Sequence, residues 1–226
     1  MMTQIIACST CEGIVLATDS RATWFDGDGE MRHFNLKKLL RLGSHSAMLS
    51  AGAGIGVEMS LAFQNFLQRQ AAEAIDDIVT MALSFFTDQY GKWLARRGMR
   101  DPSCPTADEA NEASIPQNEV YLILAGCSLK NRAQPYVLQL FSSEGEGVSI
   151  KPISTSQIIV VPRSLSIERR LEALRETGAP LDQLLSLSKS FLKKRSAQEE
   201  EVGPPFYFAT ITPDGYKEVV DEEVKG

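Results

Sequence analysis

Thr3 is the first residue whose chemistry could define a function. A threonine hydroxyl is a weak nucleophile and needs a base beside it. If the residues before Thr3 are removed, its own α-amino group can serve, because an α-amine has a reference pKa of about 7.7–8.0. A free N-terminal threonine would therefore combine nucleophile and base. Many chains carry a threonine near their start, so this position alone is weak evidence.

A carboxylate and a lysine further along the chain could assist such a nucleophile. Asp19 ends an apolar run typical of a strand buried on both faces, where a charge needs a cationic partner. In the predicted strand 35–42, alternation places Lys38 on the leucine-rich face, which we take as the core face, and Lys37 on the other. An Asp19–Lys38 pair beside Thr3 could control proton transfer. A turn-capping aspartate and an exposed basic pair are the alternatives. The face assigned to the core carries Leu36, Lys38, Leu40 and Leu42, and the other carries Lys37, Leu39 and Arg41.

The glycine-rich segment 50–56 links a predicted strand to a predicted helix. Glycine lets the backbone approach a ligand closely, and N–H groups at such a turn can stabilise an oxyanion. A phosphate-binding loop is the rival interpretation. The spacing is G-x-G-x-G, because Val57 stands where the last glycine of G-x-G-x-x-G would be. The flanking strands also lack the context of a dinucleotide fold, so the sequence favours the oxyanion interpretation.

Composition narrows the class of protein. The chain has 226 residues, enough for one domain with its own core. A net charge of −6 argues against nucleic acid as the main partner. With two histidines and four cysteines, of which Cys8 and Cys11 form a lone C-x-x-C, we expect no metal and no cofactor. No apolar run reaches the roughly 20 residues of a membrane span, and the first residues lack a signal-peptide pattern. We therefore expect a cytoplasmic protein without a membrane partner.

Hydrophobic periodicity predicts blocks of strands separated by pairs of helices. Polar segments 24–29 and 99–118 are predicted loops, the second an exposed insertion, and the tail 221–226 is predicted to be frayed. This order differs from βαβ alternation and fits an antiparallel two-sheet sandwich with helix pairs outside, in a single domain over 1–226. The predicted strands cover 3–8, 13–20, 35–42, 46–51, 119–127, 135–141, 157–161, 206–211 and 216–220. The predicted helices begin at Ile55 and Ile75 and cover 165–176 and 181–196.

Three blocks of sequence together resemble the β-type subunits of proteasomes, a family of N-terminal-threonine (Ntn) hydrolases. The spacings from Thr3 to Asp19 and from Lys38 to Gly52 match that family, while the loop between Asp19 and Lys38 is a few residues longer. The resemblance covers nearly the whole chain. It implies an α+β fold, a four-layer αββα sandwich of two antiparallel sheets flanked by helix pairs. The blocks are Gly13-Ile14-Val15-Leu16-Ala17-Thr18-Asp19-Ser20-Arg21-Ala22-Thr23, Lys37-Lys38 and Ala51-Gly52-Ala53-Gly54.

The resemblance also implies roles for single residues. Thr3 would be the nucleophile, Asp19 and Lys38 its charge relay, and the Gly52 N–H the donor to the oxyanion. Arg21 would be a structural partner near that centre. The pocket for the residue before the cut would be lined by Ala22, Ser50 and Gly54, whose small side chains suggest a roomy pocket.

Two segments depart from the family pattern. Where the family has Gly-Ser-Gly-Ser before the third helix, this chain has Val-Pro-Arg-Ser, and Ser164 could replace the serine that bonds the nucleophile's amine. Where the family has Asp-x-x-Ser-Gly-Gly after the fourth helix, this chain has Glu-Glu-Glu-Val-Gly-Pro. Glu199 could replace the acid, whereas Val202 has no hydroxyl to replace the serine.

Three functions remain open at this point. The first is a threonine peptidase that cleaves peptides or unfolded proteins inside stacked rings of identical subunits, with an ATP-dependent unfoldase as a further partner. The second is an Ntn amidase acting on small amides. The third is a catalytically weak ring subunit that needs a partner. The presence of Thr3, Asp19 and Lys38 favours an enzyme, and its mechanism requires the removal of Met1 and Met2.

Overall fold

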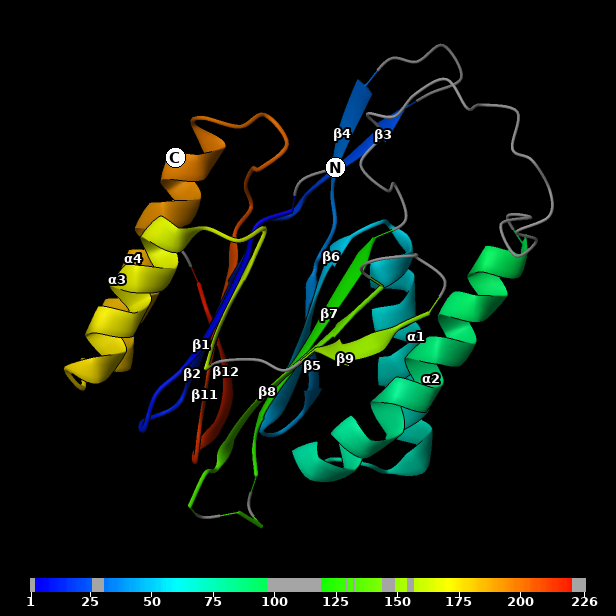
Figure 1. Cartoon of the computed structure of the whole chain (residues 1–226), viewed down its shortest axis with the longest axis horizontal. Helices are drawn as coiled ribbons and strands as arrows, with labels where there is room; N and C mark the ends of the chain where they lie inside the picture. Colours follow the sequence, from blue (N-terminus) through cyan, green and yellow to red (C-terminus); the bar gives the residue numbers. More distant parts are fainter. Residues whose placement is uncertain are drawn as a thin grey trace.

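The computed structural model combines two antiparallel sheets with four described helices (Figure 1). The predicted insertion 99–118 and the tail 221–226 lie outside the described residues. None of the helices in the described part is long and apolar enough to cross a membrane. The structure describes residues 3–25, 31–96, 119–128, 130–131, 133–143, 149–153 and 157–220.

Each sheet has five strands, and every pairing within them is antiparallel. A separate two-stranded hairpin extends from their edge (Figure 1). The first sheet contains, in spatial order, β10 (Ile158–Val161), β1 (Ile5–Ser9), β2 (Ile14–Thr18), β11 (Tyr207–Thr212) and β12 (Gly215–Val219). The second contains β5 (Leu39–Gly43), β6 (Ser46–Gly52), β7 (Val120–Cys127), β8 (Tyr136–Ser142) and β9 (Lys151–Ile153). The hairpin consists of β3 (Arg21–Phe25) and β4 (Met31–Asn35).

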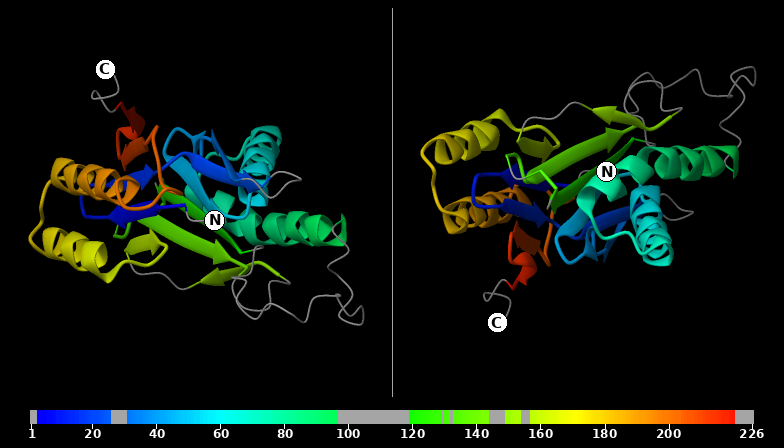
Figure 2. Two further views of the ribbon diagram at one scale, coloured as in Figure 1. Left: turned by 90° about the horizontal axis from the view of Figure 1, so that it is seen from above. Right: turned by 90° about the horizontal axis from the view of Figure 1, so that it is seen from below.

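The helices cover the outer faces of the two sheets in pairs (Figures 1 and 2). Along α1, Met59, Phe63 and Leu67 are buried at intervals of four residues, the spacing of one helix face. The pair against the second sheet is α1 (Ile55–Gln70) and α2 (Ile75–Arg96). The pair against the first sheet is α3 (Leu165–Glu176) and α4 (Leu181–Ser196).

Buried apolar side chains gather in three clusters that hold these elements together. Residues such as Phe63 and Phe141 join α1 and α2 to the second sheet. Ile5 and Leu49 belong to the cluster between the two sheets, and Ile6 belongs to the cluster beneath α3 and α4. Successive residues of β1 therefore enter different clusters, which explains its continuous apolar sequence. The prediction of an α+β fold with antiparallel sheets is confirmed.

Two sequence predictions for the segment 21–42 are wrong. The expected loop over 24–29 is wrong at Trp24 and Phe25, which belong to β3 of the hairpin in which Arg21 pairs with Asn35. The rest of that predicted loop, 26–29, lies outside the described residues. Residues 32–35 of that hairpin are exposed, so they show no apolar alternation. The expected strand 35–42 begins only at Leu39. The three-residue strand β9 was also not predicted, since so short a strand shows little periodicity.

The division of this segment into a core face and an exposed face is also wrong in part. Leu39 is fully buried between the sheets, although alternation had placed it opposite the core. Leu42 packs beneath α1 and α2. Both faces of β5 are covered by other elements. The burial of a residue therefore does not show on which face of the strand it lies. The inward position of Lys38 and the exposure of Lys37 are nevertheless as predicted.

Candidate functional site

Thr3, Asp19 and Lys38 meet between the two sheets, at the ends of β1, β2 and β5. Thr3 directly precedes β1, and Asp19 directly follows β2. These strands are antiparallel neighbours with Ile5 opposite Thr18, so the register brings Thr3 beside Asp19. Lys38 directly precedes β5 of the other sheet and reaches both residues from there.

The Lys38 ammonium has an acceptor for each of its three protons. Its Nζ donates to Thr3 Oγ1 at 2.8 Å, to both carboxylate oxygens of Asp19 at 3.2 Å, and to the Arg21 carbonyl at 2.5 Å. All of these acceptors fit a protonated lysine, which has three donors and no acceptor. Asp19 is fully buried, and Thr3 and Lys38 are each 3% exposed. The nucleophile candidate thus contacts a buried cation.

Two backbone groups complete the surroundings of Asp19. The Gln4 N–H donates to Oδ1 at 3.0 Å, and the Arg21 N–H donates to Oδ2 at 3.0 Å. An ionised carboxylate is an acceptor only, and every partner here is a donor. The hydrogen-bond pattern therefore matches the charged form of the Asp19–Lys38 pair.

Burial opposes the charge on each member of this pair. It raises the pKa of Asp19, while Lys38 and the two backbone N–H groups pull that pKa down again. Burial also lowers the pKa of Lys38, while Asp19 raises it. Each charge thus offsets part of the desolvation of the other. A desolvated ammonium at this distance from the Thr3 hydroxyl is able to stabilise negative charge on that oxygen.

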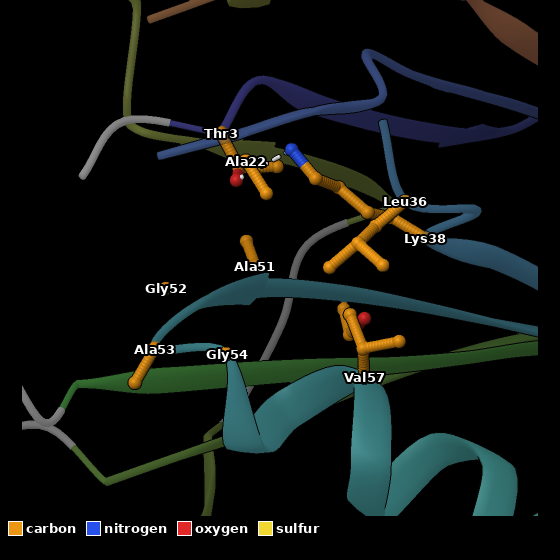
Figure 3. A pocket seen from close by; sticks show the side chains of 10 residues that line it. Thr3, Ala22, Leu36, Lys38, Ala51, Gly52, Ala53, Gly54 and Val57 are labelled. Carbon is orange, nitrogen blue, oxygen red and sulfur yellow. Dashed lines mark hydrogen bonds between the residues drawn. The ribbon is translucent and has the colours of Figure 1, made fainter. Parts of the chain in front are cut away.

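Gly52 ends β6 on the opposite side of the pocket from Thr3 (Figure 3). Its φ is +86°, in the left-handed region that favours glycine. A Cβ at this position would collide with the carbonyl oxygen of Glu119. That carbonyl also accepts the N–H of Ala53 at 2.7 Å, which fixes the turn between β6 and α1. Both observations explain why the chain has glycine here.

A small pocket lies between Thr3 and this turn, with about 10 Å³ of accessible space, room for about one water molecule. The small side chains predicted to line this pocket suggested a roomy pocket. The pocket is narrower than that, because Leu36 and Val57 also project into it (Figure 3). The predicted pocket residues Ala22, Ser50 and Gly54 all line it. Its other lining residues are Thr3, Leu36, Lys38, Ala51, Gly52, Ala53 and Val57.

Ser164 and Glu199 lie outside the cluster around Thr3. The backbone N–H of Ser164 bonds the Glu168 carboxylate at 3.2 Å, and the Glu199 carboxylate pairs with Arg195 at 2.6 Å. In the described part of the chain, no hydrogen bond joins either side chain to Thr3. Neither residue lines the pocket described above.

The segment that follows α4 supports the site through Arg21. The Arg21 guanidinium donates to the Glu200 carbonyl at 2.6 Å. The Ser20 N–H donates to the Gly203 carbonyl at 3.2 Å. A Cβ on Gly203 would collide with the guanidinium, so glycine lets Arg21 lie flat against this segment. Because the Arg21 main chain binds both Asp19 and Lys38, this packing helps to position the pair.

The described residues offer no alternative metal or thiol centre. They contain no group of three or more His, Cys, Asp and Glu side chains placed to hold a metal ion. Cys8 is buried, and burial raises its pKa to about 12. A thiol with so high a pKa is a poor nucleophile at neutral pH. Cys11 is exposed, and both cysteines are free.

No protein-family model matches the sequence, and a search of curated proteins finds no significant similarity.

Proposed function

We propose that this chain is an N-terminal-threonine hydrolase that cleaves peptide bonds. The observation that carries the proposal is the buried Lys38 ammonium, which contacts Thr3 Oγ1 at 2.8 Å and the fully buried Asp19 at 3.2 Å. A structural role alone would not require a threonine hydroxyl at the mouth of a pocket beside this pair. The order of helices and sheets supports the four-layer αββα sandwich that such enzymes share.

The chemistry begins once the residues before Thr3 have been removed. The free α-amine of Thr3 accepts the hydroxyl proton as Oγ1 attacks the substrate carbonyl carbon. The Lys38 ammonium stabilises the developing alkoxide, and Asp19 keeps that ammonium charged and in place. The Gly52 N–H is our candidate donor to the carbonyl oxygen as it becomes an oxyanion.

The tetrahedral intermediate then breaks its C–N bond. The proton held by the α-amine passes to the leaving amine, and the acyl group remains as an ester on Thr3. Water attacks the ester carbonyl, again with the α-amine as base, which releases the acid and restores the hydroxyl. No cofactor or metal is needed at any step.

We further propose that identical subunits form stacked rings in the cytoplasm, as the resemblance to proteasome β-type subunits implies. Peptides or unfolded proteins would be the substrates, and an ATP-dependent unfoldase could supply them. The narrow pocket keeps one alternative open, an amidase that acts on small amides.

The test compares the Thr3→Ala and Thr3→Ser variants. Thr3→Ala removes the nucleophile and should abolish hydrolysis of fluorogenic peptides, whereas Thr3→Ser keeps a hydroxyl and an α-amine and should retain measurable activity. Intact-mass analysis of the active protein should show a chain that begins at Thr3 and carries one label from a threonine-directed electrophile. Activity in Thr3→Ala, or in protein that keeps both methionines, would contradict the mechanism. Faster hydrolysis of small amides than of peptides would favour the amidase.

A further inference from the structure

Gln4 is fully buried next to Thr3, and one end of its carboxamide has no partner. Its Nε2 donates to the carbonyls of Val161 and Pro162 at 3.2 and 3.4 Å. Its Oε1 has no hydrogen-bond partner among the described residues. The carboxamide cannot turn around to satisfy this oxygen, because Oε1 would then face two carbonyl oxygens, which only accept hydrogen bonds. Gln4 therefore keeps a free acceptor in the interior, where an unsatisfied polar atom is unfavourable.

The free acceptor lies on the side of β1 that faces β10. The Gln4 N–H donates to Asp19 Oδ1 at 3.0 Å, and the Gln4 carbonyl accepts the Asp19 N–H at 3.3 Å, so the main chain of Gln4 points toward β2. Main-chain groups of successive residues in an extended chain point to alternate sides, so the Thr3 nitrogen points toward β10. The Gln4 carboxamide lies on that side too, because it bonds Val161 at the end of β10 and Pro162 after it.

The Thr3 nitrogen will need acceptors once it becomes an α-amine. Among the described residues, no hydrogen bond engages the Thr3 N–H. The released group is an ammonium at or below neutral pH, with three protons to donate. Neither Ser164 nor Glu199 bonds to Thr3 in the described part of the chain. The Thr3 hydroxyl faces Lys38, whereas its nitrogen lies in the strand, one residue from Gln4. The future ammonium and the free acceptor thus share one side of β1.

We propose that Gln4 is a positioning residue whose Oε1 accepts a hydrogen bond from the released α-ammonium of Thr3. This inference rests on the proposed hydrolase function. The bond holds the nitrogen where it can take the hydroxyl proton, and it gives the orphan oxygen its missing donor. An acceptor favours the charged form of an amine and so raises the pKa of that amine. Because only the neutral amine acts as a base, Gln4 also shifts the pH range in which the enzyme works.

The charged groups around the amine stay the same when Gln4 is replaced. Lys38 contacts Thr3 from the start of β5, and Asp19 contacts the next residue of β1 from the end of β2. Arg163, which follows the carbonyls that Gln4 binds, pairs with Glu168 at 3.1 Å. A change in the pKa of the amine therefore reports the loss or gain of a contact with residue 4.

The experiment measures kcat/KM for a fluorogenic peptide against pH, because the acidic limb reports the pKa of the base in the free enzyme. Gln4→Met keeps the length of the side chain without the acceptor. Its limb should move to lower pH by about 0.5–1 unit, and its maximal rate should fall by ~10-fold. Gln4→Glu replaces the acceptor by an anion, and its limb should move to higher pH by about one unit. A purely structural role would lower the rate in both variants without opposite shifts of the limb.

Gln139→Met is the matched control. Gln139 Nε2 also donates to two main-chain carbonyls, those of Leu140 and Ile153, at 2.9 and 3.3 Å. These carbonyls belong to β8 and β9 in the second sheet, so the substitution removes the same kind of bonds away from Thr3. Its acidic limb should coincide with that of the unmodified enzyme.

A second measurement does not depend on turnover. Cyanate carbamylates amines only in their neutral form, so its rate of reaction at Thr3 against pH gives the same pKa, followed by mass spectrometry of the N-terminal peptide. This pKa should move with the same sign as the limb in each variant. An unchanged pKa in either folded Gln4 variant would overturn the inference, and loss of activity in Thr3→Ala would still support the hydrolase function. If protein with a free Thr3 cleaves no substrate, the proposed function fails, and the cyanate titration still tests the contact.

Discussion

Removal of Lys38 tests whether the buried pair is ionised. Lys38→Met keeps most of the side-chain volume but leaves Asp19 without the cation that contacts both its oxygens. Asp19 is fully buried, and only the N–H groups of Gln4 and Arg21 would remain beside it. Breaking a buried ion pair by removing one partner typically costs about 3–5 kcal/mol. We expect a loss of that size in the free energy of unfolding at neutral pH.

This loss should depend on pH in a defined direction. Burial already raises the pKa of Asp19 with Lys38 present, and removing the ammonium raises it further. A carboxyl whose pKa is higher in the folded state stabilises the fold below its unfolded pKa, and that contribution is lost as the pH rises through the folded pKa. The deficit of Lys38→Met relative to the unmodified protein should therefore shrink on acidification. This deficit in the free energy of unfolding should change by at most about 1.4 kcal/mol per pH unit for one proton.

Urea denaturation at pH 5 and pH 8, followed by circular dichroism, measures both effects. Lys37→Met is the control, because Lys37 is exposed and pairs with Glu218 at the surface. It should change the free energy of unfolding by less than about 1 kcal/mol at either pH. Peptide hydrolysis should fall by ~100-fold or more in Lys38→Met and stay nearly constant in Lys37→Met. A Lys38→Met deficit below about 1 kcal/mol and equal at both pH values would refute an ionised Asp19–Lys38 pair.

Two glycine substitutions test the backbone around the site. Gly52→Ala should abolish hydrolysis and lower the free energy of unfolding by at least about 1–2 kcal/mol, because φ is +86° and a Cβ would collide with the Glu119 carbonyl. Gly54→Ala should be nearly neutral in the same urea titration, since nothing lies within 4 Å of its added Cβ. Gly203→Ala should displace the Arg21 guanidinium and lower kcat more than stability, because a flexible side-chain end can move aside. An unchanged kcat in Gly203→Ala would show that Arg21 does not position the pair.

The helices that pack against the first sheet could be predicted well from sequence. Both α3 and α4 have the predicted bounds, Leu165–Glu176 and Leu181–Ser196. Between them, Gly178 adopts a positive φ of 66°, and Pro180 directly precedes α4. These are the residue types that end and begin helices, so local chemistry fixed the boundaries.

The segment 21–42 was predicted less well because its structure depends on tertiary contacts. The strands β3 and β4 pair only with each other, and the described part of β4 is exposed, so no apolar period marks the hairpin. Leu39 and Leu40 are both largely buried, because β5 has a sheet on one side and helices on the other. A pattern rule that assumes one exposed face fails in such a strand.

The candidate site also combines features that the sequence could predict with features that depend on tertiary contacts. The types and spacing of their side chains predicted Thr3, Asp19 and Lys38 as site residues. The structure brings these three together. The Gln4 N–H and the Arg21 carbonyl complete the cluster. Every residue except proline has a backbone N–H, and every residue has a backbone carbonyl. The residue type therefore gives no sign that one of these groups takes part in a site. Ser164 and Glu199 were proposed by counting along the chain. The backbone N–H of Ser164 bonds Glu168, the Glu199 carboxylate pairs with Arg195, and in the described part of the chain no hydrogen bond joins either side chain to Thr3.

Two locally unfavourable features share one pocket. Burial opposes the charges of both Asp19 and Lys38, and the Ser50 hydroxyl is buried without a partner among the described residues. Thr3, Lys38, Gly52 and Ser50 all line that pocket. Features of this kind each lower stability and persist where the surrounding structure enforces them, which is typical of sites that bind or react. These features do not depend on likeness to any family, and they mark this pocket as the place to look for binding or reaction.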